Sequence, residues 1–107
     1  MHVSDLIARL HECVGVEVAA EGVLIVGNDS RLVASPDAPD ELCVLLPHLV
    51  VRNRLLAQVP PWGGGRYIYH EDATVLGEIS DGPPRFKAIR KLIVRREDQV
   101  YELTKFK

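Results

Sequence analysis

The side chains of this sequence that could bind a metal are scattered. Its two cysteines, Cys13 and Cys43, lie far apart and belong to no CxxC pair, and its four histidines do not cluster. His70, Glu71 and Asp72 form the densest polar run. Neighbours on a strand point to opposite faces, so these three side chains could converge only in a turn. Metal ligands must lie at usable spacing, and we therefore expect neither a metal nor a cofactor.

No nucleophile is recognisable in the sequence. A GxSxG elbow is missing, and Ser30, Ser35 and Ser80 fall in turns or at strand ends. Both cysteines are flanked by apolar residues, which predicts reduced, buried thiols that pack as small hydrophobic side chains. The glycines at 63–65 lack the GxxxxGK[ST] and GxGxxG patterns of phosphate-binding loops. We expect a protein that is not an enzyme, while a Cys–His pair assembled in space stays an open alternative.

An aromatic, glycine-rich segment is the first candidate binding surface. Trp62, the one tryptophan of the chain, stands between two prolines and three glycines, and Arg66, Tyr67 and Tyr69 follow it. Trp, Tyr and Arg dominate the hot spots of protein interfaces, so an exposed loop here would anchor a partner. The alternative is that Trp62 folds back over one end of the domain, with the glycines forming the turns.

Basic residues are concentrated in the last part of the chain. Residues 1–84 hold five Lys or Arg against twelve Asp or Glu, whereas residues 85–107 hold eight against three. Four of these basic residues share one parity on a predicted strand and form a second candidate surface: Arg85, Lys87, Lys91 and Arg95. Such a face could bind an anionic partner, or it could pair with acidic strands of the same fold. Both interpretations stay open.

Period-two alternation places most of the chain in strands. Ser4 is a suitable N-cap and predicts a helix over residues 5–12. Residues 14–27 alternate up to Gly22 and then become fully apolar, which predicts one long strand, bent at the glycine and covered on both faces afterwards. A second helix is expected over residues 48–58, with Leu49, Val51, Leu55, Leu56 and Val59 on its apolar side.

Further strands are expected at residues 31–34, 42–46, 66–70, 73–80, 85–96 and 99–106, the last two as a hairpin. Segment 85–96 also has helical spacing, which leaves a helix there as the alternative. At 107 residues the chain fits one domain, with a helix in residues 1–12 and a barrel-like core in residues 13–107.

This element order resembles the OB-fold over about residues 13–105. The resemblance depends on the strand break at Gly22 and on the helix that precedes the Ala73–Ser80 strand, between the third and fourth strands. It predicts a mainly β protein of the α+β class with two short helices and a small barrel of five to six strands. The competing arrangement is an open α+β sheet with helices on one face.

The OB-like order implies a single-stranded nucleic-acid binder, which needs stacking aromatics on the second and third strands. Strands 31–34 and 42–46 contain no aromatic residue, and the loop between them is acidic. We therefore expect a non-catalytic binding or protein-interaction module of unknown target, whose partner is another protein or a second copy. Nucleic-acid binding is the alternative. Since the sequence shows neither a membrane span nor a secretory signal, we expect a cytoplasmic location.

Overall fold

The computed structural model describes residues 1–38, 42–61 and 67–106. Three helices and six strands follow one another in this part of the chain. They are α1 (Val3–Ala8), α2 (Leu10–Cys13), β1 (Glu17–Val26), β2 (Ser30–Val33), β3 (Cys43–Leu46), α3 (His48–Gln58), β4 (Tyr69–Ser80), β5 (Arg85–Arg96) and β6 (Gln99–Leu103).

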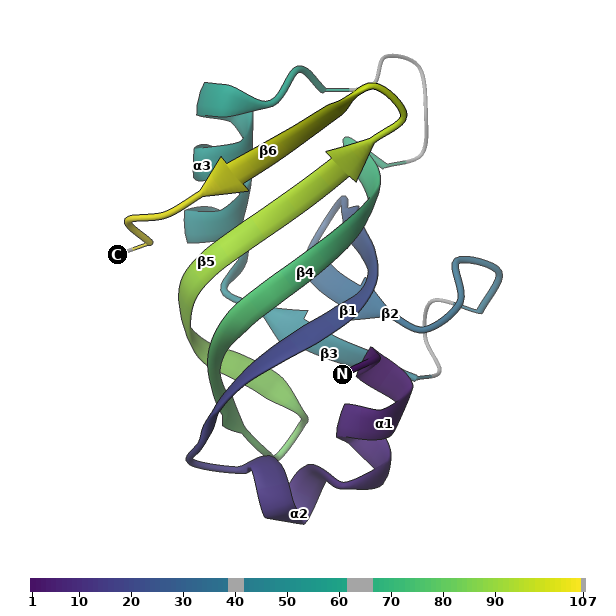
Figure 1. Cartoon of the computed structure of the whole chain (residues 1–107), viewed down its shortest axis with the longest axis vertical. Coiled ribbons are helices and arrows are strands. Elements are labelled where there is room, and N and C mark those ends of the chain that lie inside the picture. The colour runs from purple at the N-terminus through teal and green to yellow at the C-terminus, as the bar shows by residue number, and fades with distance from the viewer. Residues whose placement is uncertain (39–41, 62–66, 107) are drawn as a thin grey trace.

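Five of the strands close into a barrel (Figure 1). β1 pairs antiparallel with both β2 and β4, β2 pairs with β3, and β4 pairs with β5. A parallel bridge from Leu45 of β3 to Arg85 of β5 completes the ring, and the Leu45 amide donates to the Pro84 carbonyl oxygen at 3.1 Å. β6 adds a further strand outside the ring, on β5. The OB-like small barrel is confirmed, with residues 85–96 as a strand rather than a helix.

The bend in β1 follows from Gly22. Up to that residue β1 pairs with β4, whereas Val23–Val26 pairs with β2 and β4 at once. A Cβ atom on Gly22 would lie 2.7 Å from the Val33 carbonyl oxygen, closer than real side chains come. Leu24, Ile25 and Val26 are all buried, which confirms that the second half of the strand is covered on both faces.

Helices pack against the barrel at two places. In Figure 1, α1 and α2 lie at one end of the barrel and α3 lies behind β6. Val3 and Leu6 of α1 belong to the core cluster, as do Val51 and Leu55 of α3. The barrel interior is therefore filled by apolar side chains. No helix in the described ranges combines the length and the apolar character that crossing a membrane requires.

The first helix differs from its prediction. It begins at Val3, because the His2 ring accepts the Ser4 amide at 3.2 Å and takes the N-cap position assigned to Ser4. The helical segment also breaks at Arg9, so that two short helices, α1 and α2, replace one. The strands expected at 66–70 and 73–80 are not separate, because β4 runs without a break from Tyr69 to Ser80. Tyr67 and Ile68, expected in the first of them, lie outside any strand.

Helix α3 spans the predicted residues but buries a narrower face. Leu49 is 65% exposed and Leu56 is 43% exposed, although both were expected on the apolar side. The barrel end accepts Val51 and Leu55, one turn apart, and leaves the flanking leucines in solvent. Of the two free cysteines, Cys13 is buried as predicted, whereas Cys43 is half-buried.

Candidate interaction surface

The aromatic segment predicted as a binding surface divides into three parts. Trp62 and Arg66 lie outside the described residues. Tyr67 is half-buried and stacks on the exposed His70, with ring centroids 6.5 Å apart and ring planes 13° apart. Tyr69 is fully buried, so the prediction that it belongs to an exposed binding surface was wrong. It is the first residue of β4 and occupies an inward position of that strand.

Tyr69 instead joins α3 to the sheet. Its hydroxyl donates to the Val59 carbonyl oxygen at 2.6 Å, just beyond the last turn of α3. Burial raises the pKa of Tyr69, the nearby Arg96 guanidinium lowers it and Glu71 raises it further. The phenol thus stays protonated and keeps its role as a donor.

The basic residues of β5 reach the outer face of the sheet, but not by simple alternation. Two irregularities in the β4–β5 register change the parity along the strand. Ile89 therefore turns inward and is 7% exposed. The exposed Arg90, absent from the sequence-based set, joins Arg85, Lys87, Lys91 and Arg95 as an accessible residue of β5.

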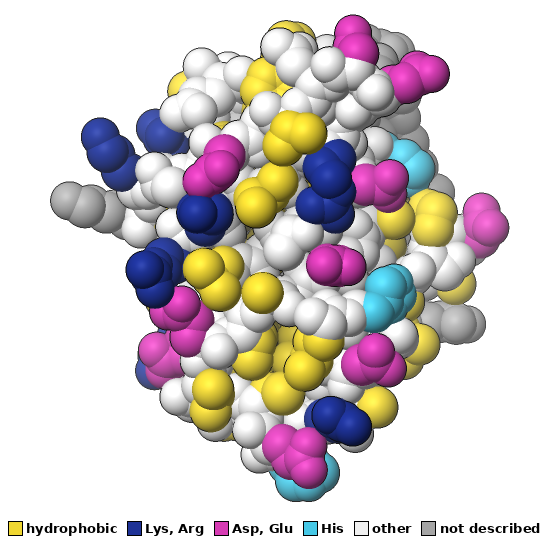
Figure 2. Space-filling model, in the orientation of Figure 1, with side chains coloured by type: hydrophobic (Ala, Val, Ile, Leu, Met, Phe, Trp, Pro, Cys, Tyr) yellow, Lys and Arg dark blue, Asp and Glu magenta, His cyan; other side chains and the backbone are white. Residues whose placement is uncertain are grey.

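Acidic side chains of neighbouring strands neutralise most of this basic group. The ion pairs are Lys87–Glu78 at 3.1 Å, Arg90–Glu17 at 3.0 Å and Lys91–Glu102 at 2.9 Å. Figure 2 shows the result, with dark blue and magenta side chains interleaved across this face. Internal pairing between strands therefore accounts for part of the charge asymmetry of the sequence.

Arg95 lies where the outer face meets the β5–β6 hairpin. Its guanidinium donates to the Thr74 hydroxyl at 2.8 Å, and its Cα is paired across the strands with Asp72 and with Val100. Arg85, in contrast, lies at the barrel closure beside Leu45. The two ends of the predicted basic face therefore have different surroundings.

A buried ion pair ties the end of α3 to the barrel. Arg96 donates to Glu71 at 2.9 Å and to the Pro60 carbonyl oxygen at 2.6 Å. The Glu71 side chain is 2% exposed and that of Arg96 13%. The hydrogen bond with Glu71 raises the pKa of Arg96, and the guanidinium lies 5.8 Å from the centre of the Tyr101 ring.

An open hollow of about 660 Å³ surrounds this ion pair. Charges of both signs line it, together with a few apolar side chains. Its described lining includes Val23, Pro60, His70, Asp72, Arg95, Glu97, Asp98 and Tyr101. A hollow with this lining favours a polar, charge-balanced contact over a deep apolar ligand.

The outer face of β2 and β3, where OB-folds typically bind nucleic acid, lacks the features of such a site. Arg31 pairs with Asp29 at 2.9 Å, and no aromatic residue lies on either strand. Ile25 and Val33, which alternate with core positions on β1 and β2, are buried outside the core cluster. This part of the face is therefore closed to solvent and offers no stacking platform.

The free edge of the sheet is β6, which follows β5 across a two-residue turn. Arg96 and Gln99 lie directly opposite each other, and the residues that flank a two-residue turn form the hydrogen-bonded pair of such a hairpin. Alternation then directs the N–H and C=O groups of Val100 and Glu102 away from β5. β6 is the last strand in the sheet order, so these groups face no further strand of the described chain.

The side chains of the β6 edge leave it open. Val100 is 63% exposed, and Gln99–Leu103 contains no proline or lysine that would hinder a further strand. The sequence indicated the strand but not its position at the edge.

The described residues hold no group of three or more His, Cys, Asp or Glu side chains that could bind a metal ion. Fold and surface together define the class of this protein, a small OB-like barrel extended by an edge strand. Comparison with protein-family models, with curated proteins and with solved structures finds no match. Any inference about function therefore depends on the geometry above.

Proposed function

We propose that this protein is a non-catalytic protein-interaction module that binds an extended polypeptide segment along β6. The observation that carries the proposal is the free edge itself, where Val100 and Glu102 direct backbone donors and acceptors outward. An added strand would pair with these groups, as in other complexes formed by strand addition. The exposed Val100 side chain would add apolar contact beside them.

A polypeptide matches this edge better than other partners do. At a strand edge the N–H and C=O groups of every second residue point outward, and another extended backbone has the same rise of about 3.3 Å per residue and the same alternation. The adjoining outer face is charge-balanced through its ion pairs, so it adds little long-range attraction for a polyanion. Specificity would come from side chains next to the edge, including those that line the hollow.

The proposal is tested by selecting binders from a random peptide library and comparing two variants at one position. Val100→Pro removes the outward N–H, and proline is tolerated at such edge positions. Val100→Thr keeps the N–H and the β-branched shape. We expect selected peptides to bind the wild type and Val100→Thr, with at least tenfold weaker binding to Val100→Pro. Equal binding to all three proteins would contradict the proposal.

The second candidate function is single-stranded nucleic-acid binding, which the OB-like strand order favours. Its test is the affinity for a labelled random oligonucleotide at low and at moderate salt. The paired basic residues of β5 predict no measurable binding at low salt. Tight binding that falls steeply with salt would favour this function instead.

A further inference from the structure

We propose that the strand added to β6 is β6 of a second copy of this chain, in antiparallel orientation about a twofold axis. The inference rests on the proposed function, since both use the same edge. α3 lies behind β6 (Figure 1), which leaves the outward edge available to a symmetry-related strand. A twofold contact presents the same surface on both protomers, so this edge must complement itself.

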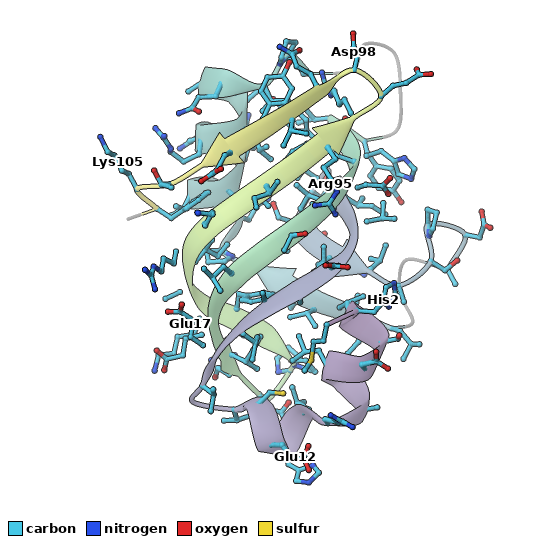
Figure 3. All side chains as sticks on the ribbon, viewed as in Figure 1. His2, Glu12, Glu17, Arg95, Asp98 and Lys105 are labelled. Carbon is cyan, nitrogen blue, oxygen red and sulfur yellow. The ribbon has the colours of Figure 1, made fainter. Side chains whose placement is uncertain are left out.

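The charges along β6 make it complementary to itself only when antiparallel. Glu97 and Asp98 precede the strand, and Lys105 follows it. Figure 3 shows Asp98 and Lys105 at opposite ends of β6. In a parallel pair these ends would meet like charges. In an antiparallel pair the acidic end of each protomer lies beside the basic end of the other, and the contact occurs twice.

The register follows from the side-chain faces. The N–H and C=O groups of Val100 and Glu102 point outward, so these residues must form the hydrogen-bonded pairs of the new ladder. Opposing Glu102 to its own copy would join two carboxylates, and opposing Val100 to its own copy would place Glu102 against Asp98. The remaining register opposes Val100 to Glu102, whose charge Lys91 already neutralises at 2.9 Å.

This register has two further consequences. Tyr101 lies at the twofold axis, opposite its own copy, on the half-buried side of the strand. Just beyond the ends of the paired strands, the register also brings Glu97, in the turn before β6, close to Lys105 of the other protomer. The joined strands are five residues long, so the contact is small and the dimer is expected to be weak.

The experiment is a sedimentation series on the full chain at about 10 μM to 1 mM, the range suited to a small interface. Glu97→Lys and Lys105→Glu each place like charges at both symmetric contacts. Each variant alone should therefore dimerise about tenfold more weakly than the wild type. Mixing the two variants pairs opposite charges again and should restore association to the wild-type level.

Val16→Glu is the matched control for a charge change, because Val16 is 51% exposed and lies before β1, away from β6. It should leave the dimer unchanged. Val100→Glu places a carboxylate opposite Glu102 of the other copy at both symmetric contacts and should abolish the dimer. A wild type that stays monomeric throughout the series would overturn the self-association. The broader function would survive that result if selected peptides still require the Val100 N–H. A dimer unaffected by Val100→Glu would likewise overturn the proposed interface.

Discussion

Glu71 and Arg96 show how strongly burial decides what the loss of one member of an ion pair costs in free energy of unfolding. Glu71 is almost inaccessible, whereas Glu17 in the Arg90 pair has a side chain that is 47% exposed. Removing one member of a buried pair leaves the other charge uncompensated. We expect Glu71→Ala to lower the free energy of unfolding by about 3–5 kcal/mol. Glu17→Ala should cost about 0–1 kcal/mol, since solvent screens an exposed pair.

Chemical denaturation of the two variants measures this difference directly. Because each substitution removes one carboxylate from an Arg–Glu pair, the comparison isolates burial. Similar small losses for both variants would mean that Arg96 is held by the Pro60 carbonyl oxygen rather than by Glu71.

Tyr69 gives the fold a predicted sensitivity to alkali. Its pKa is raised in the folded protein, mainly by burial, relative to the ordinary value of 10.0. The folded state therefore holds the proton more tightly than the unfolded chain does. This contribution to stability is complete below pH 10 and is lost as the pH rises through the higher folded-state pKa.

The measurement is the free energy of unfolding against pH for wild type and Tyr69→Phe. The variant should be less stable at neutral pH by about 0.5–1.5 kcal/mol, because it lacks the hydrogen bond to Val59. Its stability should then fall less than that of the wild type above pH 10. Parallel curves for the two proteins would contradict the assignment.

At the scale of elements, two neighbouring leucines of α3 differ sharply in burial. Leu55 is 0% exposed and lies in the core, whereas Leu56 is 43% exposed. Leu55→Ala should lower the free energy of unfolding by about 2–5 kcal/mol, as buried leucine truncations do. Leu56→Ala should change it by less than about 1 kcal/mol. Thermal and chemical unfolding check the pair, and equal losses would mean that the helix is packed on a different face.

The elements that the sequence predicted correctly are those with a strong local signal. Gly22 interrupts an alternating pattern, and Pro47 marks the start of α3, whose bounds matched the prediction. The His2 cap was missed because a histidine ring is an unusual N-cap, and Ser4 nearby is a common one. The exposed Leu49 and Leu56 could not be foreseen, since the width of the buried stripe depends on the barrel end that receives it.

The candidate site was harder to predict than the fold. Tyr69 was placed on the surface because aromatic composition suggests contact with a partner, whereas its inward position on β4 depends on strand register. The acidic partners of β5 lie on other strands, at residues as distant as Glu17. The free edge of β6 follows from sheet order, which local patterns do not encode.

At the scale of the whole molecule, the other surfaces discussed for the described residues offer less to an extended polypeptide than the β6 edge does. Apolar side chains of α1 and α3 join the core that fills the barrel. The outer face of β5 is neutralised by ion pairs, and Ile25 and Val33 are buried on the face opposite the core. The edge at Val100 and Glu102 combines exposed apolar area with outward backbone groups.

The most direct test of this account is residue-resolved amide hydrogen exchange along β6 at low and at high protein concentration. In the dilute protein we expect fast exchange at Val100 and Glu102, and protection at Tyr101 and Leu103, which bond to β5. At high concentration, Val100 and Glu102 should become protected as a second copy binds. Protection of these two amides at every dilution would show that the edge is already occupied and would contradict the account.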